Sequence, residues 1–160
     1  MVRARWRDEV ERLRGVGELL DTRDVLVGFG VGLEVAARGW DKVVWPELPE
    51  EAVEPGRWPG VRDTGVPETI PVRLPAGLVR VVQAGCWFTS VEAITALRAW
   101  RDEYPGIVPS SVDEQGAPAG PLARYEELAS QVVPTGVVWR AGLKRALVHT
   151  GVADRLPASS

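Results

Sequence analysis

The stretch LVRVVQAGCWFTSVEAITALRAWRDEYPG, residues 78–106, carries the best-marked elements of the chain and decides the fold that we predict. It opens on a short, largely β-branched apolar run with a glycine on each side, a pattern typical of a well-covered strand. Thr89 stands three residues before Glu92, which is the spacing of a capping box at a helix start. Apolar residues then recur at steps of three and four as far as a Pro-Gly pair. The sequence therefore predicts a strand over 78–83 followed by a helix over 89–104.

Three other segments have the apolar period of an amphipathic helix: 2–20, 121–133 and 136–150. Pro121 suits the first turn of its helix, because proline lacks the backbone N–H that would have no partner there. A single helical turn is also expected at 49–54, within an acidic segment. About four helices are therefore available to cover a sheet.

Residues 24–35 alternate between an apolar side chain and, mostly, a glycine or a polar one, which is the period of a half-buried strand. Residues 40–45, WDKVVW, have the composition of a returning strand, so we predict a β-hairpin over 24–45. Prolines at alternate positions permit only an edge strand at 70–74. We therefore expect an α+β fold, in which a small mixed or antiparallel sheet of this hairpin and strands near 70–74 and 78–83 packs against about four helices.

The composition indicates one globular domain over residues 1–160, with 45% hydrophobic and 26% charged residues. No apolar run approaches the roughly 18 residues of a membrane-spanning helix, and the single cysteine cannot form an internal disulfide. We expect no membrane partner and a soluble protein of the cytoplasm, or of a particle or complex assembled there. A net charge of −3 argues against nucleic acid as a partner, because sequence-independent DNA-binding domains normally carry a basic face.

The segment 46–75 holds seven of the thirteen prolines and is predicted to form a long arm. Long excursions of this kind are usually functional or draped over a partner. Trp58 lies between a glycine-containing turn and a proline, and it is the expected exposed anchor; the alternative is that it packs into the core of its own domain. The arm also carries four acidic candidates for a binding surface: Glu47, Glu50, Glu51 and Glu54.

One face of the predicted strand at 24–35 is nearly without side chains, because glycines occupy alternate positions: Gly28, Gly30 and Gly32. A bare face of this kind lets a helix, a ligand or another chain approach the backbone closely, so these glycines are candidate binding residues. We do not interpret GFGVG as a dinucleotide loop. Such a loop lies between a strand and a helix, whereas the alternation here continues to Val35.

Cys86 is the only candidate nucleophile of the cysteine type, placed by these predictions between a strand and a helix N-terminus that would stabilise a thiolate. The six residues QAGCWF resemble the nucleophile region of papain-like and transglutaminase-like cysteine enzymes, in which a Cys-Trp pair opens a buried helix. His149 and Asp154 would complete a triad in chain order. The sequence departs from those families because it contains no asparagine and because Cys86 precedes the capping box. A lone cysteine among apolar residues is usually a small buried hydrophobe.

We expect no cofactor and no metal, since the histidine, the cysteine and the carboxylates show no ligand spacing. The function that the sequence favours is a non-catalytic protein-interaction or assembly component of a larger complex, for example a viral neck or tail or another multi-subunit machine. Its partner is expected to be a protein, which includes the possibility of a homo-oligomer. The alternatives are a cysteine-dependent hydrolase or acyltransferase, and an acidic immunity or inhibitor-type protein.

Overall fold

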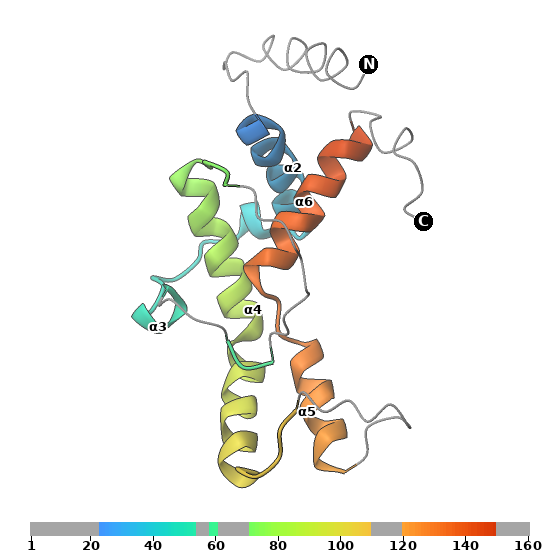
Figure 1. Cartoon of the computed structure of the whole chain (residues 1–160). Coiled ribbons are helices and arrows are strands. Elements are labelled where there is room, and N and C mark those ends of the chain that lie inside the picture. The colour runs from blue at the N-terminus through green and yellow to red at the C-terminus, as the bar shows by residue number, and fades with distance from the viewer. Residues whose placement is uncertain (1–22, 54–57, 61–70, 110–119, 150–160) are drawn as a thin grey trace, which may run out of the picture. The chain divides into compact units, whose positions relative to one another are not determined.

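A computed structural model describes residues 23–53, 58–60, 71–109 and 120–149 (Figure 1). Within these ranges the chain forms helices and no strand. The elements in chain order are α2 (Arg23–Ala37), the 3-10 helix η1 (Trp40–Lys42), α3 (Glu50–Val53), α4 (Ala76–Glu103), α5 (Pro121–Ser130) and α6 (Thr135–His149). The predicted α+β fold is therefore wrong, and the described part of the protein is all-α.

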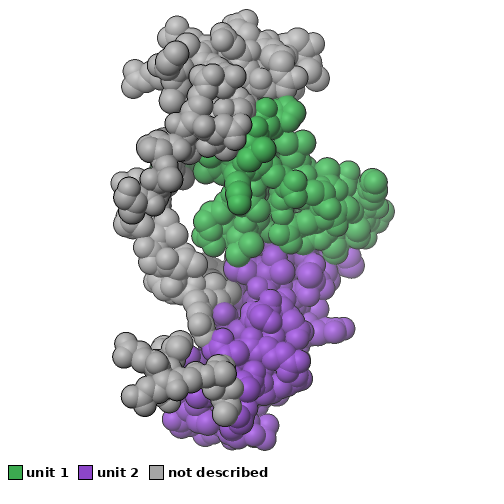
Figure 2. All heavy atoms as spheres, turned by 90° about the vertical axis from the view of Figure 1, so that its right-hand side faces the viewer, with its two compact units in different colours: residues 1–45, 69–82, 135–160 green, residues 46–68, 83–134 purple. Residues whose placement is uncertain are grey.

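The chain divides into two compact units, drawn in different colours in Figure 2. Unit 1 comprises residues 1–45, 69–82 and 135–160, and unit 2 comprises residues 46–68 and 83–134. Unit 1 contains the described helices α2, η1 and α6 and the first part of α4. Unit 2 contains α3, α5 and the rest of α4. Each unit is described below by itself.

The hairpin predicted over 24–45 is instead helical in its first half. Residues 24–35 lie in α2, and the buried side of that helix repeats at steps of one, three and four: Leu26, Gly30, Val31, Glu34 and Val35. In the second half Trp40–Lys42 forms η1, and residues 43–49 have no regular structure. The alternating apolar residues are compatible with a strand, but Gly30, which lies between two of them, contacts α6. Packing therefore decides against the local β propensity.

The strand predicted over 78–83 is part of α4, a helix of 28 residues. A glycine inside a helix costs only about 1 kcal/mol relative to alanine, so Gly85 does not end it. Thr89 is exposed in the helix interior, and the capping-box spacing that it shares with Glu92 does not mark a helix start. The edge strand predicted over 70–74 is also wrong, since residues 71–75 have no regular structure.

Three of the predicted helices are confirmed over most of their length. The segment 89–104 lies in α4 apart from its last residue, 121–133 corresponds to α5, and 136–150 corresponds to α6. Pro121 is in the first turn of α5 as expected, and the predicted turn at 49–54 contains α3. The predicted helix at 2–20 lies outside the described residues.

Unit 2 has an aromatic core between α4 and α5. The indole N–H of Trp100 donates a hydrogen bond of 2.8 Å to the carbonyl oxygen of Pro121, and its ring centroid lies 4.9 Å from that of Tyr125. Ser90 is completely buried, and its hydroxyl oxygen accepts a 2.8 Å hydrogen bond from the backbone N–H of Val133. The buried members of the core are Ala52, Trp87, Ala93, Ile94, Leu97, Trp100, Tyr125, Leu128 and Val132. Among the described helices, none is both long and apolar enough to cross a membrane.

Candidate protein-interaction site

In unit 1 the helices α2 and α6 cross at two glycines. A Cβ atom added to Gly30 would clash with the carbonyl oxygen of Gly142 and would lie 2.7 Å from the Cβ of Ala146. A Cβ added to Gly142 would lie 2.7 Å from the Cα of Val31. These separations are far inside van der Waals contact, so glycine at both positions is what allows the two backbones to touch.

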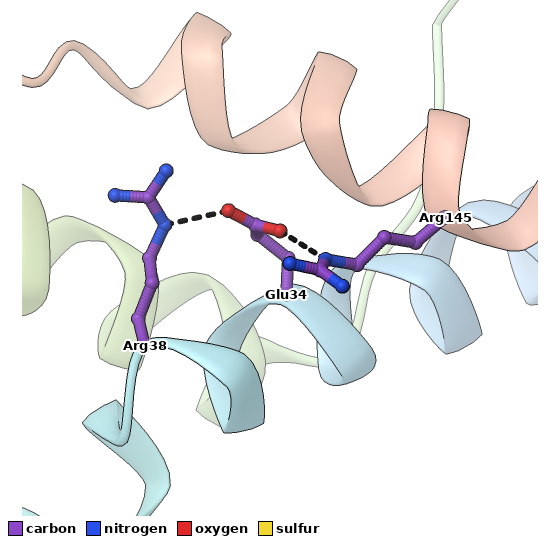
Figure 3. A network of polar contacts seen from close by, with 3 residues as sticks. All are labelled: Glu34, Arg38 and Arg145. Carbon is purple, nitrogen blue, oxygen red and sulfur yellow. Dashed lines mark hydrogen bonds and ion pairs between the residues drawn. The ribbon is translucent and has the colours of Figure 1, made fainter.

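Glu34, one turn after Gly30, ties the same two helices together (Figure 3). The side chain of Arg38 donates from Nε to Oε1 of Glu34 at 2.7 Å, and Arg145 of α6 donates from Nε to Oε2. Glu34 is only 5% exposed. Burial on its own raises the pKa of Glu34, but the hydrogen bonds from Arg145 and Arg38 outweigh burial and hold this pKa below its ordinary value. The carboxylate is therefore charged at neutral pH.

The chain turns sharply after α2, and two tryptophans fix the turn. Gly39 has the left-handed φ of 70°, and its N–H donates to the carbonyl oxygen of Ala36 at 3.0 Å. The guanidinium of Arg38 lies 5.1 Å from the ring centroid of Trp40, which is buried. Trp45 donates from its indole N–H to the carbonyl oxygen of Trp40 at 3.2 Å. Both ends of the short segment between the tryptophans are thereby held in place.

Two valines project from this segment, which together with its flanking tryptophans we call the valine corner (residues 40–45). Val43 is 44% exposed and Val44 is 96% exposed. Trp40 is buried and Trp45 half-buried, so the corner presents its aromatic rings to the protein and Val44 to solvent. Other exposed valines occur singly in the described residues, as Val53, Val108, Val137 and Val148. Scattered apolar residues are ordinary on a surface, whereas an adjacent pair on a fixed corner is a candidate contact.

The acidic residues predicted to bind a partner follow the valine corner. Glu47 and Glu50 are exposed. Glu51 is also exposed and forms an ion pair of 3.0 Å with Arg98 of α4. Glu54 lies outside the described residues. The structure therefore leaves Glu47 and Glu50 on the surface and ties Glu51 to its own unit.

Trp58, the predicted exposed anchor, is half-buried and packs on the core of unit 2. Its ring centroid lies 5.6 Å from that of Trp87 in an edge-to-face arrangement. Nearby, Gly60 has a φ of 82°, and a Cβ added to it would lie 2.9 Å from the side chain of Leu97. This contact gives Trp58 a role in its own unit.

The three candidate glycines occupy a helix, not a strand, and they differ in surroundings. Gly30 is covered by α6, as described above. A Cβ added to Gly28 would lie 3.6 Å from the side chain of Leu74, an ordinary contact. A Cβ added to Gly32 would have no heavy atom within 4 Å. Of the bare face expected from the sequence, Gly30 is already used to pack unit 1.

Cys86 is fully buried in the interior of α4. The predicted helix N-terminus near Cys86, which would stabilise a thiolate, is wrong, because α4 begins at Ala76. His149 is the last residue of α6, and its ring centroid lies 5.1 Å from that of Phe29. Cys86 belongs to unit 2 and His149 to unit 1, while Asp154 lies outside the described residues.

The polar cluster of Glu34, Arg38 and Arg145 is not among the residues singled out from the sequence. Glu34 and Arg38 are four residues apart, which is a signal of an ion pair on a helix but has no such meaning on a strand. No group of three or more potential metal ligands (His, Cys, Asp or Glu) occurs within the described ranges. No protein-family model matches the chain, and no curated protein or solved structure shows significant similarity to it.

Proposed function

We propose that the protein is a non-catalytic interaction or assembly component, and that the valine corner contacts its partner. The observation that supports this function is the exposure of Val44, which is 96% on a segment held at both ends by tryptophans. Burying a valine side chain stabilises an assembly by roughly 1.5–3 kcal/mol, a gain that the described residues of the chain do not supply at this position. Burial of the exposed Val44 side chain against a partner would therefore stabilise a complex.

The surroundings of Val44 fit such an interface. Lys42 on one side and Glu47 on the other are exposed. Protein interfaces commonly have an apolar centre and a polar rim, and charged residues at the rim steer association and disfavour wrong partners. Because the backbone is already ordered by Trp40 and Trp45, little conformational entropy is lost when a partner binds.

A photo-crosslinking amino acid at position 44 tests this function. The full chain carrying it is made in the cells that naturally produce the protein, and irradiation is expected to give a discrete adduct with one protein species. The matched control places the same amino acid at position 148, where the valine is 59% exposed on α6. Adducts that are absent at position 44, or that are the same at both positions, contradict the proposal.

A further inference from the structure

Helix α6 has an exposed side as well as the buried side that packs on α2. Gly142 and Ala146 lie on the buried side and approach Gly30 of α2. Val137 and Val148 lie on the exposed side, with exposed fractions of 39% and 59%. They are eleven residues apart in the sequence, which is about three turns of an α-helix. The two valines therefore lie in line along the helix axis and share one face of α6.

Two further residues lie in line with these valines, the half-buried Ala141 and the exposed Lys144. We call the four residues the outer stripe: Val137, Ala141, Lys144 and Val148. Their successive separations are four, three and four residues, the spacing by which one helix packs along another in a coiled coil. The aliphatic stem of Lys144 can cover apolar surface while its ammonium group stays in water. The outer stripe is therefore suited to contact with a second helix.

The charges at and beside the outer stripe are all positive. Arg140 and Arg145 flank it on its two sides, and the sequence of α6, TGVVWRAGLKRALVH, contains no acidic residue. Arg145 donates to Glu34, but its side chain remains 49% exposed. In the described part of the chain, Arg140 and Lys144 have no ion-pair partner. Charges beside a contact between two helices select the partner, so these cations select an acidic one.

Unit 1 as a whole is cationic. Its sequence has 14 lysines and arginines against 9 aspartates and glutamates, a net charge of +5, whereas unit 2 has 5 against 13, a net charge of −8. The two values add up to the −3 of the whole chain. The charge of the whole chain therefore conceals that α6 belongs to a positively charged unit. Such a unit attracts an anionic partner and accelerates its association.

We infer that the outer stripe binds an acidic amphipathic helix of a different protein. Such a helix presents apolar residues at steps of three and four with glutamates or aspartates beside them, which complement the valines and the cations of α6. The α6 helix of a second copy does not fit, because it would bring cations against cations. Nucleic acid fits less well, because phosphates would offer the apolar residues of the outer stripe nothing to pack on. This surface is additional to the valine corner, and the inference does not rest on the proposed function.

Two synthetic helical peptides of about three heptads test the inference. Both have leucines at the positions that face α6, and the flanking positions carry glutamate in one peptide and lysine in the other. The full-length chain is expected to bind the glutamate peptide, more weakly as salt is added, and not the lysine peptide. The double variant Arg140→Glu, Lys144→Glu is expected to lose about tenfold in affinity for the glutamate peptide and to bind the lysine peptide instead. Fluorescence anisotropy of labelled peptides measures both affinities.

Control variants separate the outer stripe from other charged and apolar positions. Arg80→Glu reverses an exposed cation of unit 1 on α4 and is expected to have little effect on binding of the glutamate peptide. Val148→Asp is expected to weaken that binding, while Val44→Asp, at the valine corner, does not. Circular dichroism checks that each variant keeps the helical content of the wild type.

Three results would overturn the inference: no binding of the glutamate peptide at low salt, equal binding of the two peptides, or a double variant whose preference is not reversed. Duplex DNA that binds the wild-type chain and not the double variant, in the absence of peptide binding, would assign these cations to nucleic acid instead. In the crosslinking experiment, the partner of the outer stripe is expected at position 148 as a species different from the one captured at position 44. Loss of either adduct alone then distinguishes failure of this inference from failure of the proposed function.

Discussion

Gly30 and Gly142 bring the backbones of α2 and α6 into direct contact, because a Cβ atom on either residue would meet main-chain atoms of the opposite helix. Main-chain atoms cannot rotate away as a flexible side chain can, so the helices must separate to accept a methyl group. We predict that Gly142→Ala lowers the free energy of unfolding by about 1–3 kcal/mol, the usual cost of overpacking. Urea denaturation of the variant and the wild type measures this difference.

Gly32 provides the matched control, since it lies in α2 two residues from Gly30 and a Cβ added to it has no heavy atom within 4 Å. Gly32→Ala is expected to raise the free energy of unfolding by about 0.5–1 kcal/mol through helix propensity alone. Equal effects of the two alanine substitutions would show that the crossing does not depend on close approach of the backbones.

The same crossing explains how far the fold could be predicted. The segments that form α5 and α6 have an apolar period and end signals that agree, so their positions could be predicted. The segment that forms α2 has an apolar residue at every second position, and its buried helical face includes Gly30 and Glu34, which do not contribute to an apolar period. Both residues contact α6, and the residues of α6 that they contact are more than 100 positions away along the chain.

The candidate site shows a similar division. The acidic character of residues 47–51 is visible in the composition, and Trp58 was recognisable as either an anchor or part of a core. The valine corner could not be predicted, because a returning strand over 40–45 would place Val43 and Val44 on opposite faces of a sheet. Both valines are exposed because η1 and the hydrogen bond between Trp45 and Trp40 set the course of the backbone. No pattern in the sequence predicts either feature.

Glu34 makes the stability of unit 1 depend on pH. Burial favours its neutral form, but the hydrogen bonds from Arg145 and Arg38 prevail, so the pKa in the folded chain lies below the ordinary value of about 4.3. A lowered pKa means that the unfolded chain binds the proton more tightly. The stabilisation is therefore complete above the ordinary carboxyl pKa and is lost as the pH falls through the lowered one.

We predict that Glu34→Gln lowers the free energy of unfolding at neutral pH by about 1–3 kcal/mol, because two arginines lose a charged acceptor. The difference from the wild type is expected to shrink as the pH is lowered below about 4.3. Urea midpoints measured from neutral to acidic pH check this dependence. Glu92→Gln, at an exposed position of α4, is the control and is expected to have little effect. A difference between Glu34→Gln and the wild type that is constant with pH would contradict the charged pair.

Ser90 satisfies the backbone of unit 2 from inside the core. Ser90→Ala removes the acceptor of the Val133 N–H, and we predict a loss of about 1–3 kcal/mol in the free energy of unfolding. The control is Thr95→Ala, because the hydroxyl of Thr95 donates to the carbonyl oxygen of Val91 at an exposed position where water can replace it. Its effect is expected to stay within about 0.5 kcal/mol in the same denaturation experiment. If the two variants unfold alike, the buried hydrogen bond has no special weight.

Trp58 is expected to stabilise the purified chain in the absence of any partner, because its ring packs against Trp87. We predict that Trp58→Ala lowers the free energy of unfolding by about 1–3 kcal/mol, less than for a completely buried aromatic residue. Trp58→Phe retains an aromatic ring and is expected to lose clearly less. Thermal unfolding followed by circular dichroism measures both variants. An unchanged midpoint for Trp58→Ala would instead assign this ring to a contact with another molecule.

Cys86 is expected to be unreactive in the folded chain, because its side chain is completely buried within α4. Reaction with a thiol reagent then requires an opening of the structure, so we predict labelling at least about 100-fold slower than for an exposed cysteine. The exposed reference is the double variant Cys86→Ser, Thr89→Cys, which moves the thiol by three residues on the same helix. Absorbance of the released reagent follows both rates, and denaturant is expected to make them equal. Labelling of native Cys86 as fast as that of the exposed reference would contradict its burial and would restore the case for a catalytic thiol.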